Sequence, residues 1–232
     1  NFVSNHWPND DGGNLYSAVR DEPGHDNSGG SADFHYINNS PDTYRLAGYV
    51  KRTNLTQDDY GDIFNLIKKI NNIDANGVAQ PATIGYLASV SSVIDVEEWL
   101  RYLAINMLVS NKDSGLYTGV GHKYEFYRGL IDTRFKLVPH DLDSIMGLGG
   151  GAGATASEDP FGPYTNMPAF SKFLTAPEIA PLYYKTIVDV ITTTFNNAVL
   201  DPVIDRALEG VNDANAASMK TWVANRGNSV SG

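Results

Sequence analysis

The sequence predicts an α+β fold made of two parts, a strand- and loop-rich N-terminal part over residues 1–53 and a mainly helical part over residues 54–232. Turn-forming Gly, Asp, Asn and Pro with scattered aromatic residues dominate the first part, which is typical of short strands joined by turns. From Thr56 onwards, apolar residues recur at the spacing of an amphipathic helix. Two short apolar segments at 123–128 and 135–139 interrupt this pattern and predict a β-hairpin within the helical part.

The bulk composition limits the possible functions. The chain has 232 residues, of which 42% are hydrophobic, enough for a substantial core. Its net charge of -10 argues against a nucleic-acid partner, because phosphate binding relies on Lys and Arg. The absence of cysteine excludes disulfides and thiol catalysis. The sequence contains no run of about 18 apolar residues, so no membrane span is predicted. Few lysines and abundant Asn, Gly, Ser, Thr and Tyr favour a secreted or cell-surface protein.

In the first part, the segments 14–16 and 44–46 are the best strand candidates, and 21–33 is expected to be a loop. The residues 56–59, Thr-Gln-Asp-Asp, resemble a capping box and predict the start of a helix that ends near Asn71. This helix is expected to bury its apolar stripe, because the intervening isoleucines recur at helical spacing.

Two possible metal sites are weak. The residues 72–77, Asn-Ile-Asp-Ala-Asn-Gly, resemble the first half of an EF-hand loop, but Thr83 stands at the twelfth position, where a bidentate Glu is required. A plain Asn-Gly turn is therefore the favoured interpretation. The five histidines show no ligand spacing, so a structural zinc site is not expected.

The next helix is predicted to begin at Asp95, which is expected to act as its N-cap, with Glu98 at the reciprocal position of a capping box. Its apolar stripe ends shortly before Asn111 and Asp113, so the helix delivers both side chains to its C-terminal end. After the hairpin, the glycine-rich residues 148–163 predict a mobile loop, since the Gly-Lys-Ser/Thr ending of a phosphate-binding P-loop is absent. Further helices are expected over 170–174, 177–198 and 213–226.

The second hairpin segment leads into Asp141 and Asp143. An apolar segment that ends in two carboxylates and precedes a glycine-rich loop can hold a divalent cation against phosphate oxygens. In an extended segment, Asp141 and Asp143 would point to the same side. The alternative is that one of them caps a helix at Ile145 and the other is solvated.

Asp113 strengthens the metal-site interpretation. The order of features matches that found in protein kinases: a carboxylate after a buried helix, a hairpin, a second carboxylate and a mobile segment. In that order the first carboxylate orients or deprotonates the acceptor hydroxyl, and the second holds Mg²⁺ on the ATP phosphates. The literal kinase signatures His-Arg-Asp and Asp-Phe-Gly are absent.

Three segments are distinctive: Asn-Lys-Asp at 111–113, His-Lys-Tyr-Glu-Phe-Tyr at 122–127, and Val-Pro-His-Asp-Leu-Asp at 138–143 with Gly147. In these segments the chain resembles the CotH-type spore-coat protein kinases, a divergent atypical branch of the kinase fold. Further similarity extends over nearly the whole chain. It includes the segments 13–16, 32–34 and 49–53, the helix from Asp58, and a tail with Trp222 and Arg226.

The resemblance implies a kinase-like fold that is mostly the helical large lobe, with the small lobe expected before Asn1. It also implies ATP-dependent phosphorylation of Ser residues on extracellular or coat proteins, with ATP and a Ser-rich protein as partners. Asp113 would be the catalytic carboxylate and Asp141 the Mg²⁺ ligand, with Asp143 as a second ligand or a structural partner.

Two alternatives remain open. Lys123 stands where the family often has Asn, and a cation there would compete with Mg²⁺, which favours a catalytically inactive kinase-like binding or scaffold module of an extracellular or envelope assembly. The other is a metal-dependent nucleotide-sugar transferase, in which Asp141 and Asp143 would hold a cation on a diphosphate. Repeated strand-helix units before the motif would support that alternative, whereas the sequence predicts a long helix there.

Overall fold

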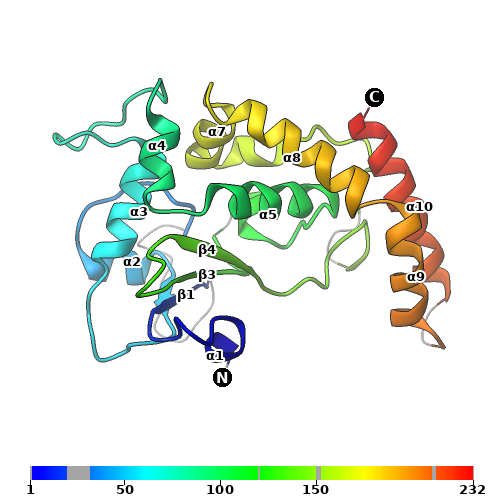
Figure 1. Ribbon diagram of the computed structural model, residues 1–232, viewed down its shortest axis with the longest axis horizontal. Helices are drawn as coiled ribbons and strands as arrows, with labels where there is room; N and C mark the ends of the chain where they lie inside the picture. The colour runs from blue at the N-terminus through cyan, green and yellow to red at the C-terminus, as the bar shows by residue number, and fades with distance from the viewer. Residues whose placement is uncertain (1, 20–31, 120, 150–152, 211–212, 232) are drawn as a thin grey trace.

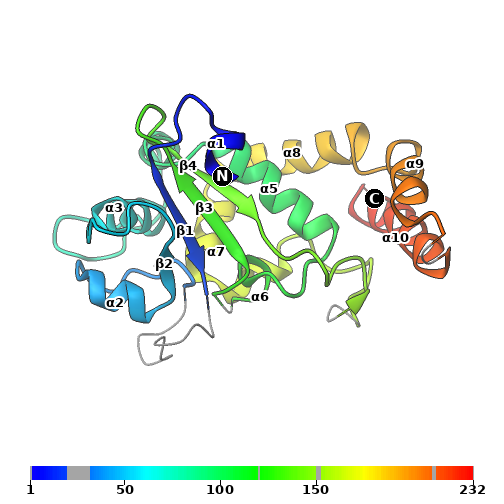
Figure 2. The same cartoon turned by 90° about the horizontal axis from the view of Figure 1, so that it is seen from below.

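A computed structural model describes residues 2–19, 32–119, 121–149, 153–210 and 213–231 of the chain. Its centre is a four-stranded antiparallel sheet in the order β2-β1-β3-β4. Figures 1 and 2 show that α5, α7 and α8 lie on one side of this sheet and α1 on the other. The helices α9 and α10 pack on each other at one end of the molecule, away from the sheet.

The sheet takes strands from both parts of the chain. β1 (Asn14–Ala18) lies in the interior and pairs with β2 (Tyr49–Lys51) on one side and with β3 (Tyr124–Arg128) on the other. β3 and β4 (Phe135–Pro139) form the predicted hairpin, with Phe126 opposite Leu137. The strand expected at 14–16 is therefore confirmed as part of β1.

The strand expected at 44–46 is wrong, because these residues belong to the short helix α2 (Pro41–Leu46). Pro41 occupies the first turn, where its fixed φ suits a helix and its missing N–H is not needed. The chain turns at Gly48, whose φ of 92° suits glycine, and the strand β2 begins one residue later. The local helix start at Ser-Pro-Asp overrode the strand preference of Tyr44.

The helices differ from expectation mainly at their ends. α3 begins at Gly61 rather than at Thr56. The helix expected over 177–198 is divided into α8 and α9 at 194–196. The side chain of Asn196 accepts the N–H of Val199 and so caps the start of α9. The helices are α1 (Phe2–His6), α2, α3 (Gly61–Asn71), α4 (Tyr86–Ser91), α5 (Val96–Leu108), α6 (Gly115–Thr118), the 3-10 helix η3 (Gly162–Asn166), α7 (Pro168–Thr175), α8 (Ala180–Thr193), α9 (Asn197–Leu208) and α10 (Asp213–Ser231).

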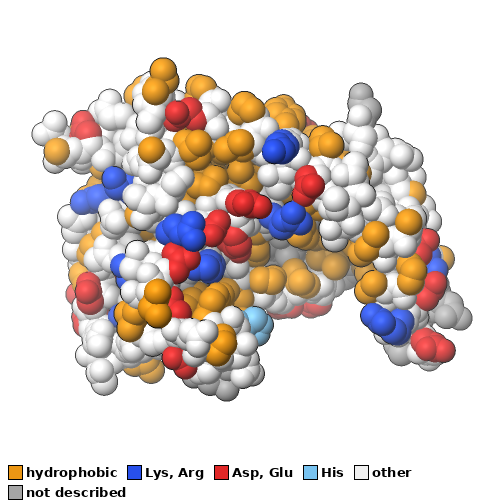
Figure 3. All heavy atoms as spheres, viewed as in Figure 1, with side chains coloured by type: hydrophobic (Ala, Val, Ile, Leu, Met, Phe, Trp, Pro, Cys, Tyr) orange, Lys and Arg blue, Asp and Glu red, His pale blue; other side chains and the backbone are white. Residues whose placement is uncertain are grey.

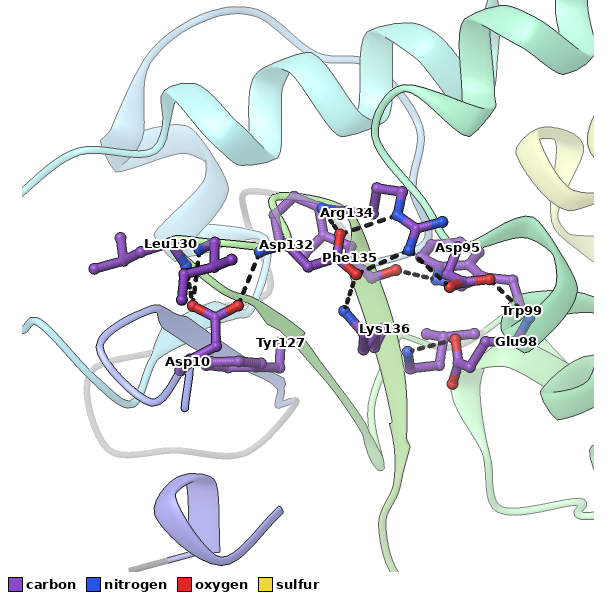
Figure 4. A network of polar contacts seen from close by, with 12 residues as sticks. Asp10, Asp95, Glu98, Trp99, Tyr127, Leu130, Asp132, Arg134, Phe135 and Lys136 are labelled. Atoms are coloured by element: carbon purple, nitrogen blue, oxygen red, sulfur yellow. Dashed lines mark hydrogen bonds and ion pairs between the residues drawn. The ribbon is translucent and has the colours of Figure 1, made fainter. Parts of the chain in front are cut away.

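The helix α5 is fixed to the hairpin by polar contacts as well as by burial. Asp95 caps it as predicted, because its carboxylate accepts the N–H of Glu98. The reciprocal half of the capping box is wrong: the Glu98 carboxylate accepts the N–H of Leu137 at 3.2 Å, on β4. The indole N–H of the buried Trp99 donates to the carbonyl of Phe135 at 2.8 Å. Figure 4 shows these contacts between α5 and β4.

An aromatic core fills the space between the sheet and the helices. The ring of the fully buried Phe34 lies 5.1 Å from that of Phe170 on α7, 5.8 Å from that of Trp99 on α5 and 5.9 Å from that of Phe126 on β3. Such ring pairs add to the free energy that burial supplies. The core therefore holds α5 and the hairpin in a fixed mutual position. None of the described helices is both long and apolar enough to cross a bilayer.

Candidate functional site

Three carboxylates meet at the open end of the hairpin. Asp113 follows α5, whereas Asp141 and Asp143 follow β4. Each offers one oxygen atom, and these atoms lie within 4.8 Å of one another. Asp113 is partly buried and the other two are exposed, so the cluster lies at the surface. The structure thus brings together the three acidic residues that the sequence predicted as site residues.

The turn after α5 positions Asp113. Ser110, with a φ of 50°, reverses the chain after the helix, and the buried Asn111 follows. The Asn111 side-chain oxygen accepts the backbone N–H of Asp113 at 3.3 Å and that of Ser114 at 3.2 Å. Its Nδ2 has no hydrogen-bond partner within the described ranges. Asn111 therefore fixes the backbone from which the Asp113 carboxylate projects.

The segment after β4 does not continue as an extended strand. Asp141 has a φ of 54°, in the left-handed region that Asp and Asn tolerate better than most residues. The expectation that Asp141 and Asp143 project from an extended segment is therefore wrong, although both reach the cluster. No helix begins at Ile145 in the described residues 141–149, so neither carboxylate has the capping role of the alternative. The N–H of Met146 donates to the carbonyl of Val109 at 2.6 Å and ties this segment to the end of α5.

Lys123 lies between two of the carboxylates. Its ammonium group contacts Asp113 Oδ2 and lies 2.9 Å from Asp141 Oδ2. The hydrogen bonds that Lys123 donates to Asp113 and Asp141 raise the pKa of Lys123 above its usual range, and the one to Asp141 lowers the pKa of that carboxyl group. His122 Nε2 lies 3.5 Å from Asp113 Oδ1. Three carboxylates face one ammonium group, so the cluster keeps an excess of negative charge.

The donor set suits a hard divalent cation. Carboxylate oxygens are the preferred protein ligands of Mg²⁺, which binds through one or two of them and fills its other positions with water or substrate phosphates. Asp113, Asp141 and Asp143 could each supply such an oxygen. No cluster of Cys and His ligands is found among the described residues. The residues present therefore fit a magnesium ion.

Glu158 is a residue of this region that the sequence analysis missed. Burial would raise the pKa of its carboxylate, but hydrogen bonds from Lys112, Tyr117 and Ser110 lower it to about 2. Lys112 Nζ lies 2.7 Å from Glu158 Oε1, so the ammonium group of Lys112, the residue before Asp113, pairs with Glu158. No local pattern marks Glu158 in its glycine-rich surroundings, because its contacts are with the distant turn after α5 and with α6.

The glycine-rich segment, expected to be a mobile loop over 148–163, has firm contacts in its described part. The Arg226 guanidinium on α10 donates to the carbonyls of Ala156 at 3.1 Å and Glu158, and Trp222 on the same helix donates to the carbonyl of Leu108 at 2.9 Å. Residues 150–152 lie outside the described residues. The C-terminal helix therefore supports both the end of α5 and the segment after the acidic cluster.

The EF-hand-like segment forms a turn. The Asp74 carboxylate accepts the backbone N–H groups of Asn76 and Val78, each at 2.9 Å, and the side-chain N–H of Gln80 at 2.8 Å. These donors satisfy the carboxylate within the chain. The contacts agree with the Asn-Gly turn, and residues 72–77 supply no group of three acidic ligands.

In this α+β fold, Asp141 and Asp143 after the hairpin lie beside Asp113, which follows α5. The family model described as CotH kinase protein matches residues 1–229 of the 232, and the chain belongs to the CotH kinase family. Membership implies, in general terms, the use of a nucleotide and a divalent metal ion. No curated protein matches the chain. Within the described ranges the sheet is antiparallel, without the repeated strand-helix units that would support the nucleotide-sugar transferase alternative.

Proposed function

We propose that this chain is a protein kinase that transfers the γ-phosphoryl group of ATP, with Mg²⁺, to Ser hydroxyls of secreted, cell-surface or spore-coat proteins. The observation that carries the proposal is the convergence of Asp113, Asp141 and Asp143 at the open end of the hairpin. Phosphoryl transfer depends mainly on positioning and on electrostatic stabilisation, and an exposed cluster of carboxylates on a rigid support can supply both. The described helices and hairpin would correspond to the large lobe of a kinase.

Asp113 is assigned the role of the catalytic carboxylate. It would accept a hydrogen bond from the acceptor Ser hydroxyl and orient that oxygen for in-line attack, taking up its proton as the new bond to the γ-phosphorus forms and the bond from that phosphorus to the leaving oxygen of ADP breaks. The turn around Asn111 supports this role, because it fixes the Asp113 backbone through two hydrogen bonds. Catalysis of this kind requires a carboxylate held in one place.

Asp141 and Asp143 are assigned to the metal site. They would hold Mg²⁺, with Asp141 as the main ligand, and a bound Mg²⁺ neutralises charge on the phosphate oxygens. Ser144 Oγ donates to Asp143 Oδ1 at 3.0 Å, which orients that carboxylate. The bond between Met146 and Val109 holds the metal-binding segment against the end of α5. The proposed catalytic and metal-binding carboxylates thus share one rigid support.

A second candidate is a kinase-like module without catalysis that serves as a binding or scaffold domain in an extracellular or envelope assembly. The observation that favours it is the ammonium group of Lys123, which lies on Asp113 and Asp141, where a metal ion would otherwise find its ligands. Both candidates place the protein outside the cell or at its surface. They differ in whether the cluster takes up a metal-nucleotide complex.

Calorimetric titration of the chain with Mg-ATP, and with ATP plus EDTA, distinguishes the two. The proposal expects magnesium-dependent binding that Asp141→Asn abolishes, because Asn keeps the left-handed backbone but loses the charge. Asp132→Asn at the other end of the hairpin is the matched control and should leave binding unchanged. Absence of binding, or binding that survives Asp141→Asn, would overturn the kinase assignment and favour the binding module.

A further inference from the structure

The ammonium group of Lys123 lies between Asp113 and Asp141, two of the three carboxylates of the acidic cluster on which the proposed function rests. We infer that Lys123 is a tethered counter-ion that occupies the cation position of this cluster and must leave before a divalent metal ion binds. The residue would then set the metal concentration at which the cluster becomes loaded. This role concerns metal affinity and is distinct from the chemistry assigned to Asp113.

The geometry makes the two cations mutually exclusive. Lys123 Nζ contacts Asp113 Oδ2 and lies 2.9 Å from Asp141 Oδ2, so it bridges the proposed catalytic carboxylate and the main proposed metal ligand. A magnesium ion would need its oxygen ligands at about 2.1 Å. An ammonium group hydrogen-bonded to the same two oxygen atoms blocks that approach and repels the incoming positive charge. Metal binding at these atoms therefore requires the Lys123 side chain to move away.

Charge also favours the exchange once metal is abundant. One ammonium group neutralises only part of the charge of three carboxylates, whereas a divalent ion neutralises more of it. The side chains of Lys123, Asp113 and Asp141 are 30%, 28% and 35% exposed, so water reaches the pair and a displaced ammonium group can be solvated. Ion pairs with this exposure are weak enough to be exchanged.

The backbone of residue 123 has a conformation that lysine adopts less readily than some other residue types. Lys123 has a φ of 57°, a left-handed conformation that Asn and Gly adopt more readily. Its N–H donates to the carbonyl of Ala18 at 3.2 Å, directly before β3 begins. Substitution by Asn therefore removes the charge while keeping the backbone conformation, so Lys123→Asn is expected to fold without added backbone strain.

Titration with Mn²⁺ alone, followed by calorimetry and by the electron paramagnetic resonance signal of free Mn²⁺, measures the effect without an activity assay. Lys123→Asn is expected to lower the Kd for Mn²⁺ by about tenfold or more, where tenfold corresponds to about 1.4 kcal/mol. Lys123→Arg retains the positive charge and is expected to bind Mn²⁺ no more tightly than the unaltered protein. Circular dichroism checks that both variants are folded.

Lys112→Asn is the matched control for a general change in charge. Lys112 is next to Asp113 in the chain, but its ammonium group lies 2.7 Å from Glu158 and not in the cluster. Its substitution is expected to change the Kd for Mn²⁺ by less than about threefold, because its charge lies outside the site and solvent ions screen it in part. Equal tightening by Lys112→Asn and Lys123→Asn would overturn the inference.

The remaining outcomes separate this inference from the proposed function. If Asp141→Asn abolishes Mn²⁺ binding but Lys123→Asn does not tighten it, the role of Lys123 is overturned and the metal site stands. If neither the unaltered protein nor Lys123→Asn binds Mn²⁺, the inference is overturned together with the kinase proposal. Tightening in Lys123→Asn alone supports the tethered counter-ion.

Discussion

The two ends of the hairpin carry similar residue types but differ in the ratio of acidic to basic side chains. At the turn end, Arg134 Nη2 lies 2.9 Å from Asp132 and 3.2 Å from Asp95, and Lys136 Nζ lies 2.8 Å from Asp132 (Figure 4). Two carboxylates there face two cations. Basic and acidic side chains alternate across the middle of the face in Figure 3, over the region where α5 and the hairpin lie in Figure 1.

At the open end, by comparison, carboxylates outnumber the basic side chains that pair with them. There the ammonium group of Lys123 pairs with Asp113 and Asp141, and Asp143 is the third carboxylate of the same cluster. A balanced network has little tendency to bind another ion, whereas an excess of carboxylates held close together attracts a cation. The same two strands therefore carry a structural ion-pair network at one end and the candidate site at the other. The difference lies in the ratio of opposite charges, since the residue types are alike.

The largest expected effect separates the two ends by function. Asp113→Asn should lower the rate of phosphoryl transfer to a Ser acceptor by about 10²- to 10⁴-fold, the usual contribution of a general acid or base. It should change the free energy of unfolding by less than about 1 kcal/mol, because the ion pair of Asp113 is partly exposed. Radiolabel transfer from ATP and urea denaturation measure the two quantities.

Asp132→Asn at the turn end is the paired variant. It should leave the transfer rate unchanged and lower the free energy of unfolding by about 1 kcal/mol, since it weakens contacts with Arg134 and Lys136. Equal loss of rate in both variants would mean that the two ends do not differ in function.

The second effect concerns Glu98, which lies on α5 beside the turn-end network (Figure 4). Burial raises its pKa to about 7 from the model-compound value of 4.5. The folded protein then keeps a proton that the unfolded chain releases, so stability falls as pH rises between these values. Glu98→Gln removes this loss, and its stability advantage should grow by about 3 kcal/mol from below pH 4.5 to above pH 7.

Urea denaturation at pH 4 and pH 8 would measure this growth. Gln can still accept the N–H of Leu137, so the contact with β4 is retained. Glu97→Gln, on the exposed neighbour, serves as the control and should give the same small change at both pH values. An advantage of Glu98→Gln that does not depend on pH would contradict the assignment.

The smallest expected effect tests the turn end alone. The Asp10 carboxylate accepts the backbone N–H groups of Leu130, Ile131 and Asp132 at 2.7, 2.8 and 2.9 Å. Asp10→Ala should lower the free energy of unfolding by about 1 to 2 kcal/mol, since water replaces the lost acceptor only in part. Hydrogen exchange of these three amides should accelerate, while Mn²⁺ binding at the open end should not change. Asp11→Ala, which removes one exposed contact to Ser4, is the control.

Local patterns predicted the elements whose sequences carry strong signals. The hairpin, the strand at 14–16 and the helix capped by Asp95 are confirmed, because alternation and capping depend on residues close in sequence. The strand expected at 44–46 and the single helix over 177–198 are wrong. In both cases a local start signal, Pro41 in α2 and Asn196 before α9, outweighed the apolar pattern.

The sequence by itself determined the family, the α+β class and the three acidic residues that the structure brings together. Tertiary structure alone decided how their charges are balanced. Lys123 forms an ion pair with Asp141 across the open end of the hairpin. Lys112 forms one with Glu158, which lies more than forty residues away in the chain. Electrostatic interaction depends on distance in space, and the chain sets that distance only when α5, the hairpin and α10 pack together.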